Sequence, residues 1–257
     1  QNIFHDGRWV GIFQFTEGGA QKLCQRVMPT NLVDLSAITS IYRPGPLSAG
    51  VDKGYVEARR DPELVEYPHE LFRQVTKDTA GFLIFQEQIA ELAHKLGRNL
   101  TLDEGNKLRK LLTKKGVAEV EKEKKKIKKK FIDGCNQKKI DFATSEKIWD
   151  LFEYFSGYGF NKSHAISYSM LSFQCAWLMN YYPIEWMAAF LDKEPEGRKE
   201  RAINLARKFG FKLQPLTINH SGKVWEISDD NETLIQPLST IKGLGDSAID
   251  QIIANRP

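Results

Sequence analysis

The fold class of this 257-residue chain is set by the stretch Gln86-Glu87-Gln88-Ile89-Ala90-Glu91-Leu92-Ala93-His94-Lys95-Leu96-Gly97. Its apolar residues recur at i, i+3, i+4 and i+7, which is the period of one face of an α-helix: Ile89, Leu92, Ala93 and Leu96. Gly97 is typical of the residue that ends a helix. The pattern predicts a helix over 86–96 whose apolar face lies in a core.

More helices are predicted after this one. The next begins at a capping box, in which Thr101 and Glu104 satisfy each other's backbone N–H groups, and it turns three leucines inward: Leu108, Leu111 and Leu112. Further helices are expected from Gly116 to near Gly134, over 144–155, over about 165–181, and from Pro183 onward.

The segment before residue 86 mixes helices with breaks. A β-prone piece covers 9–15, and helices are expected over 20–27, from a cap at Asn31 or Asp34 to Ile41, and over 70–77. Arg43-Pro44-Gly45-Pro46 is predicted to be a rigid turn, because two prolines around a glycine cannot continue a helix. Residues 81–85 are expected to be extended.

After Pro195 the pattern changes. A helix is predicted over 199–209, followed by short strands over 224–227 and 233–238 around the turn Asp229-Asp230-Asn231, and by a final helix. The predicted fold is therefore mainly α over 1–195, with a few short strands, and a small α/β segment over 196–257.

Charge is concentrated in one stretch. The whole chain carries a formal net charge of +4, but Lys107–Lys130 holds 12 Lys or Arg against 3 Glu, which is a net charge of +9. This concentration indicates a polyanionic partner. The 41% hydrophobic composition is enough for a core.

Three separate cysteines without a CxxC pair give no zinc ribbon or disulfide framework, so we expect a cytoplasmic protein. No signal peptide and no apolar run of membrane-spanning length is found, and no membrane partner is expected. Because the chain starts at Gln1, we expect either a processed product or a piece of something longer.

The first candidate site is the polar side of the helix that follows Thr101. It carries four cations within two turns: Arg109, Lys110, Lys114 and Lys115. Because leucines anchor the opposite side, these cations could be held near one triphosphate. The alternative is a solvated helix face. The lysines of 117–130 lie around most of their helix, as expected for solvent exposure or loose contact with a DNA backbone.

The second candidate site is the loop Tyr158–His164. Its glycines allow close backbone approach, and its last four residues offer donors and a cation at a helix N-terminus, where anions are favoured: Asn161, Lys162, Ser163 and His164. The alternative is structural, with Ser163 as the N-cap of the helix.

A third candidate is Ile241-Lys242-Gly243-Leu244-Gly245, which is similar to a helix-hairpin-helix turn. In such a turn Lys242 and the backbone of Gly243 and Gly245 would contact a DNA phosphate; a plain tight turn is the alternative. No Asp-x-Asp pair, Walker motif, GxSxG or HExxH is present, so no catalytic residue and no metal ligand is predicted in this chain. Asp229-Asp230 is interpreted as turn chemistry.

Eight stretches carry a family resemblance. They are Gly11–Phe15, Ile41–Leu47, Tyr67–His69, Gly81–Gln88, Leu108–Lys110, Thr113–Lys115, Tyr158–His164 and Tyr182–Ala189. In this order and spacing, over roughly 11–245, they resemble the alpha subunit of bacterial DNA polymerase III, a C-family replicative polymerase. Each stretch is short, but eight in order are hard to reach by chance.

The resemblance implies that 1–195 is the fingers domain of such a polymerase and that 196–257 is a small segment ending in the hairpin-like turn. The implied reaction is the templated addition of dNTPs to a primer 3′-OH, with release of pyrophosphate. The implied partners are primer-template DNA and dNTP, and in the complete protein a sliding clamp and other replisome subunits. The Mg²⁺ ions of the complete polymerase would be held by palm aspartates outside this chain.

Site roles follow from the same resemblance. Arg109 and Lys110 match the basic pair that faces the triphosphate, and Lys114 and Lys115 match the lysines after it. Asn161, Lys162, Ser163 and His164 match the loop beside the nascent base pair, where the Ser-His pair resembles the element that senses the sugar. Arg43 lies in the family's Arg-Pro-Gly-Pro turn, with a mainly architectural role.

The chain departs from the family at two points. It has Arg109-Lys110 where Arg-Arg is usual, and Leu112-Thr113-Lys114-Lys115 where a Met-Gly-Lys-Lys-like run is usual. A lysine neutralises phosphate but lacks the bidentate fork of arginine. Lys110 is therefore expected to attract phosphate, but to bind it less strongly than an arginine would. These differences indicate a divergent member, from a phage or an unusual bacterium.

Two other interpretations remain at this point. One is a stand-alone, non-catalytic DNA-binding module derived from such a polymerase, which an upstream palm with Asp-x-Asp would contradict. The other is an unrelated scaffolding protein with a solvated lysine helix, which salt-dependent DNA binding would contradict.

Overall fold

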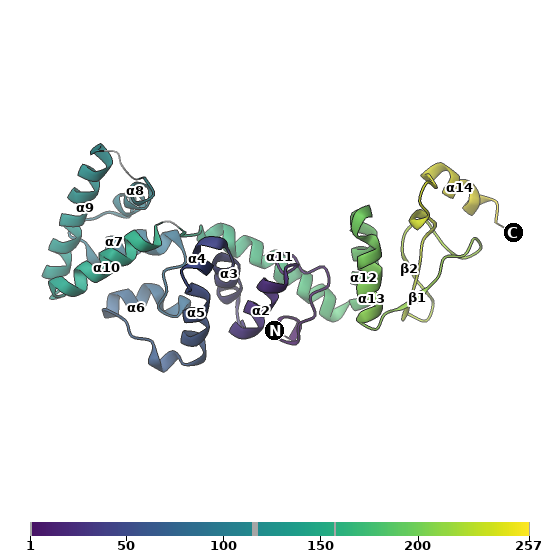
Figure 1. Cartoon of the computed structure of the whole chain (residues 1–257), viewed down its shortest axis with the longest axis horizontal. Helices are drawn as coiled ribbons and strands as arrows, with labels where there is room; N and C mark the ends of the chain where they lie inside the picture. Colours follow the sequence, from purple (N-terminus) through teal and green to yellow (C-terminus); the bar gives the residue numbers. More distant parts are fainter. Residues whose placement is uncertain (1, 115–117, 157, 257) are drawn as a thin grey trace. The chain divides into compact units, whose positions relative to one another are not determined.

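The computed structural model describes residues 2–114, 118–156 and 158–256 (Figure 1). Helices dominate, and the described strands form a single small sheet, so the prediction of a mainly α fold is confirmed. The chain forms two compact units: residues 2–7 with 17–171, and residues 8–16 with 172–256. The predicted division between a fingers domain and a smaller segment at residue 195 concerns function and stays a prediction.

The first unit is helical. Its helices are α1 (Asn2–Asp6), α2 (Gly18–Val27), α3 (Leu32–Ile41), α4 (Pro44–Ser48), α5 (Val51–Arg60), α6 (Glu70–Thr76), α7 (Gln86–Leu96), α8 (Leu102–Leu112), α9 (Ala118–Gln137) and α10 (Phe142–Phe155), with 3-10 turns at Pro62–Leu64 and Lys77–Thr79. Helix α11 (Lys162–Tyr181) begins in this unit and continues into the second.

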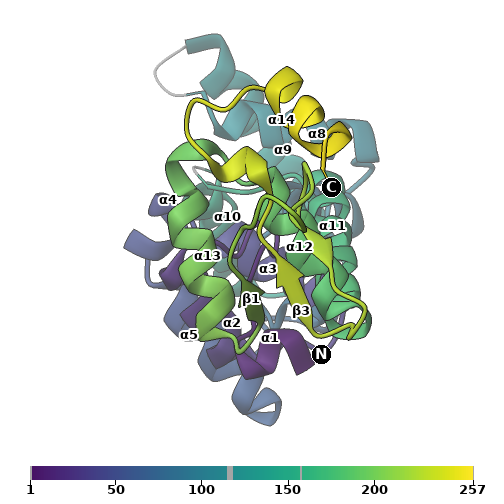
Figure 2. The same cartoon turned by 90° about the vertical axis from the view of Figure 1, so that its right-hand side faces the viewer.

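The second unit adds α12 (Pro183–Lys193), α13 (Lys199–Lys208), α14 (Asp246–Ala254) and a small sheet of β1 (Lys212–Gln214), β2 (Glu226–Ile227) and β3 (Thr233–Ile235), with 3-10 turns at Glu196–Arg198 and Leu238–Thr240. The strand order is β1-β3-β2, in which β1 pairs with β3 in parallel and β2 pairs with β3 antiparallel. Figure 2 shows β1 and β3 side by side. The hairpin of β2 and β3 was predicted, and β1 was not.

Two local predictions were wrong. The Arg43–Pro46 segment is not only a turn: Pro44 is the first residue of α4, a position where the missing N–H of proline costs no hydrogen bond. Residues 9–15 form turns instead of the expected β-prone structure, with Ile12 N donating to Trp9 O at 3.2 Å. The predicted end of α3 at Ile41 and its cap at Asn31 are confirmed, because the Asn31 side chain accepts from Asp34 N.

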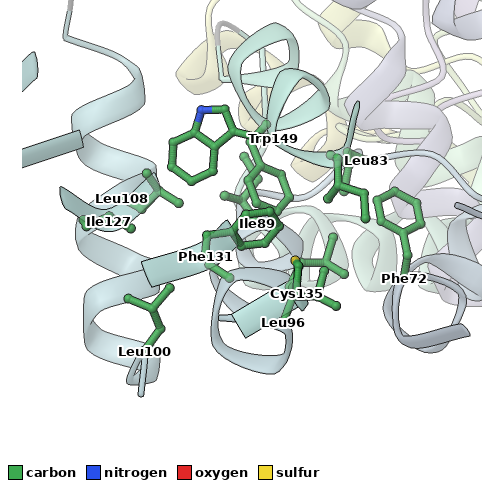
Figure 3. Close-up of a cluster of buried hydrophobic side chains, with 14 of the residues drawn as sticks. Phe72, Leu83, Ile89, Leu96, Leu100, Leu108, Ile127, Phe131, Cys135 and Trp149 are labelled. Atoms are coloured by element: carbon green, nitrogen blue, oxygen red, sulfur yellow. The ribbon is translucent and has the colours of Figure 1, made fainter. Parts of the chain in front are cut away.

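The main core of the first unit lies between α6, α7, α8, α9 and α10. Figure 3 shows their apolar side chains gathered in one cluster, which includes Leu108 and Ile127. The Phe131 ring of α9 lies 5.5 Å from the Trp149 ring and 5.4 Å from the Phe152 ring of α10, measured between centroids. Burial of such rings fixes the helices on one another. The cluster therefore sets the position of α8 and of the cations that it carries.

Gly105 allows α8 to lie directly against α7. A Cβ at this residue would be 2.9 Å from Ala90 Cα, which is closer than real side chains approach a backbone. The N-terminus of α8 is fixed by the predicted capping box, in which Glu104 N donates to Thr101 Oγ1 at 3.2 Å and Thr101 N donates to the Glu104 carboxylate at 3.0 Å. Leu108 and Leu112 are buried as predicted, whereas Leu111 is only partly buried.

Candidate functional site

Arg109 and Lys110 lie on the outward side of α8, but the helix ends at Leu112, so the prediction that Lys114 belongs to the same helix was wrong. Arg109 is half-buried, and Lys110 and Lys114 are exposed. Within the described parts of the chain, no carboxylate oxygen lies within 4.0 Å of any of these three cations. Their charges are therefore available to an anion from solution. Lys115, the fourth predicted cation, lies outside the described residues.

Arg109 and the loop of residues 158–164 are brought together by Gln86, the first residue of α7. Arg109 Nη1 donates to Gln86 Oε1 at 2.7 Å, and Gln86 Nε2 donates to the carbonyl oxygen of Gly159 at 2.9 Å. One amide side chain thus joins a cation of α8 to the backbone of the loop. Gln86 thus places Arg109, from the first predicted site, beside the backbone of the loop that was predicted as the second.

The backbone of the loop is held at three successive carbonyl groups. Tyr158 O accepts from Arg43 Nη2 at 2.6 Å, Gly159 O accepts from the Gln86 side chain, and Phe160 O accepts from Gln86 N at 2.9 Å. Phe160 N donates to Ile84 O at 3.1 Å, which makes a parallel bridge between Phe85 and Phe160. A Cβ at Gly159 would lie 2.7 Å from Phe155 Cε1, so the loop needs a glycine there.

Arg43 makes contacts that hold the loop. In addition to the bond to Tyr158 O, its Nε donates to Ser40 O at 2.8 Å, and its guanidinium lies 4.5 Å from the centroid of the Phe160 ring. Partial burial lowers the pKa of Arg43 from its ordinary value. These contacts use carbonyl groups and an aromatic ring, and the architectural role of Arg43 stays a prediction.

The N-terminus of α11 already holds an anion from the chain itself. Lys162 N donates to a Glu87 carboxylate oxygen at 2.9 Å, and Asn161 Nδ2 donates to the other oxygen at 2.8 Å. His164 N donates to Asn161 Oδ1 at 2.8 Å. The cap of the helix is therefore Asn161 and not Ser163, whose hydroxyl donates to Asn161 Oδ1 at 2.7 Å. Glu87 occupies the place where an external anion was expected.

The remaining side chains of this loop are arranged along α11. The His164 ring is exposed and lies 4.1 Å from the Tyr168 ring and 5.4 Å from the Phe160 ring, between centroids. Lys162 Nζ lies 5.7 Å from the centroid of the Phe85 ring. His164 thus presents one edge of an aromatic group to solvent next to the fixed loop.

The lysines of α9 divide by the side of the helix on which they lie. Three form ion pairs with glutamates of α8 and α10, at Nζ–Oε distances of 2.6–2.8 Å: Lys124 with Glu153, Lys128 with Glu146, and Lys130 with Glu104. The hydrogen bond from Lys130, with one from Thr101 N, lowers the pKa of Glu104. Four others are exposed, and none of the described carboxylates lies within 4.0 Å of them: Lys122, Lys125, Lys126 and Lys129.

The tail turn lies in the second unit. Gly243 has a φ of +88°, and Lys242, Gly243 and Gly245 are all exposed. The turn links the 3-10 turn Leu238–Thr240 to α14, so only a short helical piece precedes it. Asp246, the first residue of α14, lies 3.6 Å from Lys223 Nζ and puts a negative charge beside the turn. DNA contact by this turn stays a prediction.

No three His, Cys, Asp or Glu side chains lie together as metal ligands among the described residues. In the same ranges, no helix has the length and apolar character needed to cross a membrane.

Two residues of the site were not identified as functional candidates from the sequence. Gln86 and Glu87 lie in Gly81–Gln88, one of the family-like stretches, but a glutamine and a glutamate at a helix N-terminus are ordinary there. Only their position in that stretch, and not their chemistry, could have identified them as site residues.

Comparison with known proteins identifies the family. The family model described as the bacterial DNA polymerase III alpha subunit finger domain matches residues 1–139. The DNA polymerase III subunit alpha of Campylobacter jejuni is 32% identical over 97% of this chain, that of Vibrio cholerae 31% over 98%, and that of Escherichia coli K12 32% over 95%. The chain covers 21–22% of the length of these relatives. The predicted resemblance is confirmed: this chain belongs to the family of the bacterial DNA polymerase III alpha subunit finger domain.

Proposed function

We propose that this chain is the fingers part of a DNA-directed DNA polymerase and that α8 binds the triphosphate of the incoming dNTP. The observation that carries the proposal is the state of Arg109. Its guanidinium is half-buried and is held by a neutral amide, with no described carboxylate in ion-pair contact. A fixed and uncompensated cation is what a phosphate site needs.

Lys110, on the exposed side of α8, and Lys114, two residues after the end of the helix, are proposed to extend this site, and Lys115 to join them. As the leaving pyrophosphate gains charge, these cations would stabilise it without having to reorganise. Lys110 contributes charge but no bidentate fork, so Arg109 is expected to contribute most of the selectivity for phosphate geometry.

The loop of Asn161, Lys162, Ser163 and His164 is proposed to check the sugar and the shape of the nascent base pair. Support comes from its fixed backbone, because a checking element must keep its position when a wrong nucleotide enters. His164 and Ser163 are exposed, and Ser163 would have to exchange its bond to Asn161 for one to a substrate.

The complete polymerase is proposed to act in the cytoplasm on primer-template DNA and dNTPs, with a sliding clamp and other replisome subunits as partners. Its Mg²⁺ ions would neutralise phosphate charge during transfer. As the family resemblance implies, their ligands are proposed to be aspartates of the palm, outside this chain. Lys242, Gly243 and Gly245 are proposed to contact the DNA backbone.

The test is Arg109→Ala in the full-length polymerase that carries this sequence. We expect the KM for dNTP to rise and kcat to fall, with a loss in kcat/KM of about tenfold to a hundredfold, because a charge-assisted contact to phosphate is lost. The Kd for primer-template DNA should stay unchanged. Arg60→Ala is a matched control, since Arg60 is an exposed arginine at the end of α5. Normal dNTP kinetics in Arg109→Ala would show that the assignment of α8 is wrong.

A further inference from the structure

The amide of Gln86 can be oriented in only one way. Arg109 offers only N–H donors and the carbonyl of Gly159 offers only an acceptor, so the amide oxygen must face Arg109 and the amide nitrogen must face Gly159. Reversing the amide would place donor against donor and acceptor against acceptor. Gln86 therefore fixes the guanidinium and the loop at the same time, with one side chain.

The contact also leaves the charge of Arg109 unchanged. Four nearby lysines on α8 and α9 are held by carboxylates, which neutralise them: Lys107 by Glu123, Lys124 by Glu153, Lys128 by Glu146 and Lys130 by Glu104. Arg109 is held by an amide. Its only hydrogen bond to the described chain uses one N–H of Nη1, so its other N–H groups remain for a ligand.

From these two observations we infer that Gln86 is a positioning residue whose neutrality is required: it holds Arg109 against the loop without taking the charge that the triphosphate needs. The inference rests on the proposed function of Arg109 and adds a residue that acts through it. A glutamate of the same shape would keep the contact to Arg109 but would form an ion pair and compete with phosphate.

The chain offers an isosteric test in the full-length polymerase. Gln86→Glu should raise the KM for dNTP about tenfold or more, because a carboxylate competes for Arg109. The melting temperature should change little, because the new ion pair with Arg109 offsets both the lost bond to Gly159 O and the contact between two acceptor oxygens that replaces it. A purely structural role for Gln86 would instead lower the melting temperature and leave the KM unchanged.

Two further variants separate position from charge. Gln86→Met removes both hydrogen bonds but adds no charge, so Arg109 stays cationic and loses only its fixed position. We expect Gln86→Met to raise the KM less than Gln86→Glu does. Gln137→Glu makes the same chemical change at an exposed position on α9 and should leave the KM for dNTP unchanged.

A double-variant cycle shows whether Gln86 acts through Arg109. In an Arg109→Ala background, Gln86→Glu should cause little further rise in KM, because there is no guanidinium left to neutralise. A full additional rise would mean that the carboxylate repels the nucleotide directly, which would overturn the inference. If Arg109→Ala raises the KM and Gln86→Glu does not, the inference fails and the proposed function stands. If neither changes the KM, the proposed function itself fails.

Discussion

Helices α8 and α9 follow one another in the chain and are both rich in cations, yet their half-buried cations are held by opposite kinds of group. On α9 the half-buried lysines face carboxylates of α8 and α10 and act as ties between helices. On α8 the half-buried Arg109 faces a neutral amide and keeps its charge. A count of basic residues does not distinguish these cases. The two cases are distinguished by the partner of each cation, which is a carboxylate for the inner lysines of α9 and a neutral amide for Arg109.

The domain thus contains two kinds of held cation, one neutralised by a carboxylate and one that keeps its charge. A cation paired with a carboxylate is neutralised and has little charge left for a ligand, whereas a cation held by a neutral dipole is fixed and keeps its charge. The proposed nucleotide site therefore lies on α8, whereas the paired lysines on the inner side of α9 connect that helix to α8 and α10. The exposed lysines of α9 belong to neither class.

The largest effect on stability is expected where α8 packs against α7, at Gly105. Gly105→Ala puts a methyl group against the backbone of Ala90, which should lower the free energy of unfolding by about 1–3 kcal/mol. Urea unfolding measures this loss. If α8 moves to relieve the contact, the KM for dNTP should rise as well. Gly18→Ala is the control, because a Cβ there would meet nothing within 4 Å. Unchanged stability in Gly105→Ala would mean that α7 and α8 are not held this close.

A smaller effect tests the inner lysines of α9. Lys128→Met removes an ion pair to Glu146 and a cation–π contact with Trp149, so the free energy of unfolding should fall by about 0.5–1 kcal/mol. The KM for dNTP should not change. The adjacent Lys129→Met removes an exposed lysine with no described carboxylate in ion-pair contact and should have no measurable effect on unfolding. Equal losses in the two variants would remove the distinction between the sides of α9.

The smallest effect on nucleotide use is expected when all four exposed lysines of α9 are changed to glutamine: Lys122, Lys125, Lys126 and Lys129. The KM for dNTP should equal that of the wild type, which steady-state kinetics can check. The salt dependence of primer-template binding then separates solvation from DNA contact, because each lysine on a phosphate contributes about 0.9 to the slope of log K against log salt. A raised KM would instead place the exposed lysines of α9 in the nucleotide site.

The sequence predicts the helices of this domain well where the signal is local. The period of Ile89, Leu92 and Leu96 defines α7, and Thr101 with Glu104 defines the start of α8, because each pattern lies within one or two turns. The strand β1 was missed because it has only three residues and pairs in parallel with a strand some twenty residues away. Pro44 was interpreted as a turn residue because a proline predicts a break and a helix start equally well.

The site was predictable only in part. The cations of α8 and the loop of residues 158–164 were visible in the sequence as candidates, but their connection was not, since Gln86 lies 73 residues from Gly159. The ion pairs of the α9 lysines could not be predicted from the sequence either. Its lysines meet glutamates 18 and 26 residues away, at Glu146 and Glu104, and only the packing of α8, α9 and α10 brings them together. A run of lysines predicts charge but not its partner.

The bridge between Phe85 and Phe160 has a consequence for how this domain can change in evolution. It joins the residue before α7 to the loop before α11, so the chain segment that contains α7, α8, α9 and α10 begins and ends at this bridge. The entropy of closing a loop grows only slowly with its length, and doubling that length costs about 0.6 kcal/mol. Insertions in the exposed connections between these helices are therefore expected to cost little, provided that the bridge and the packing of the helices are kept.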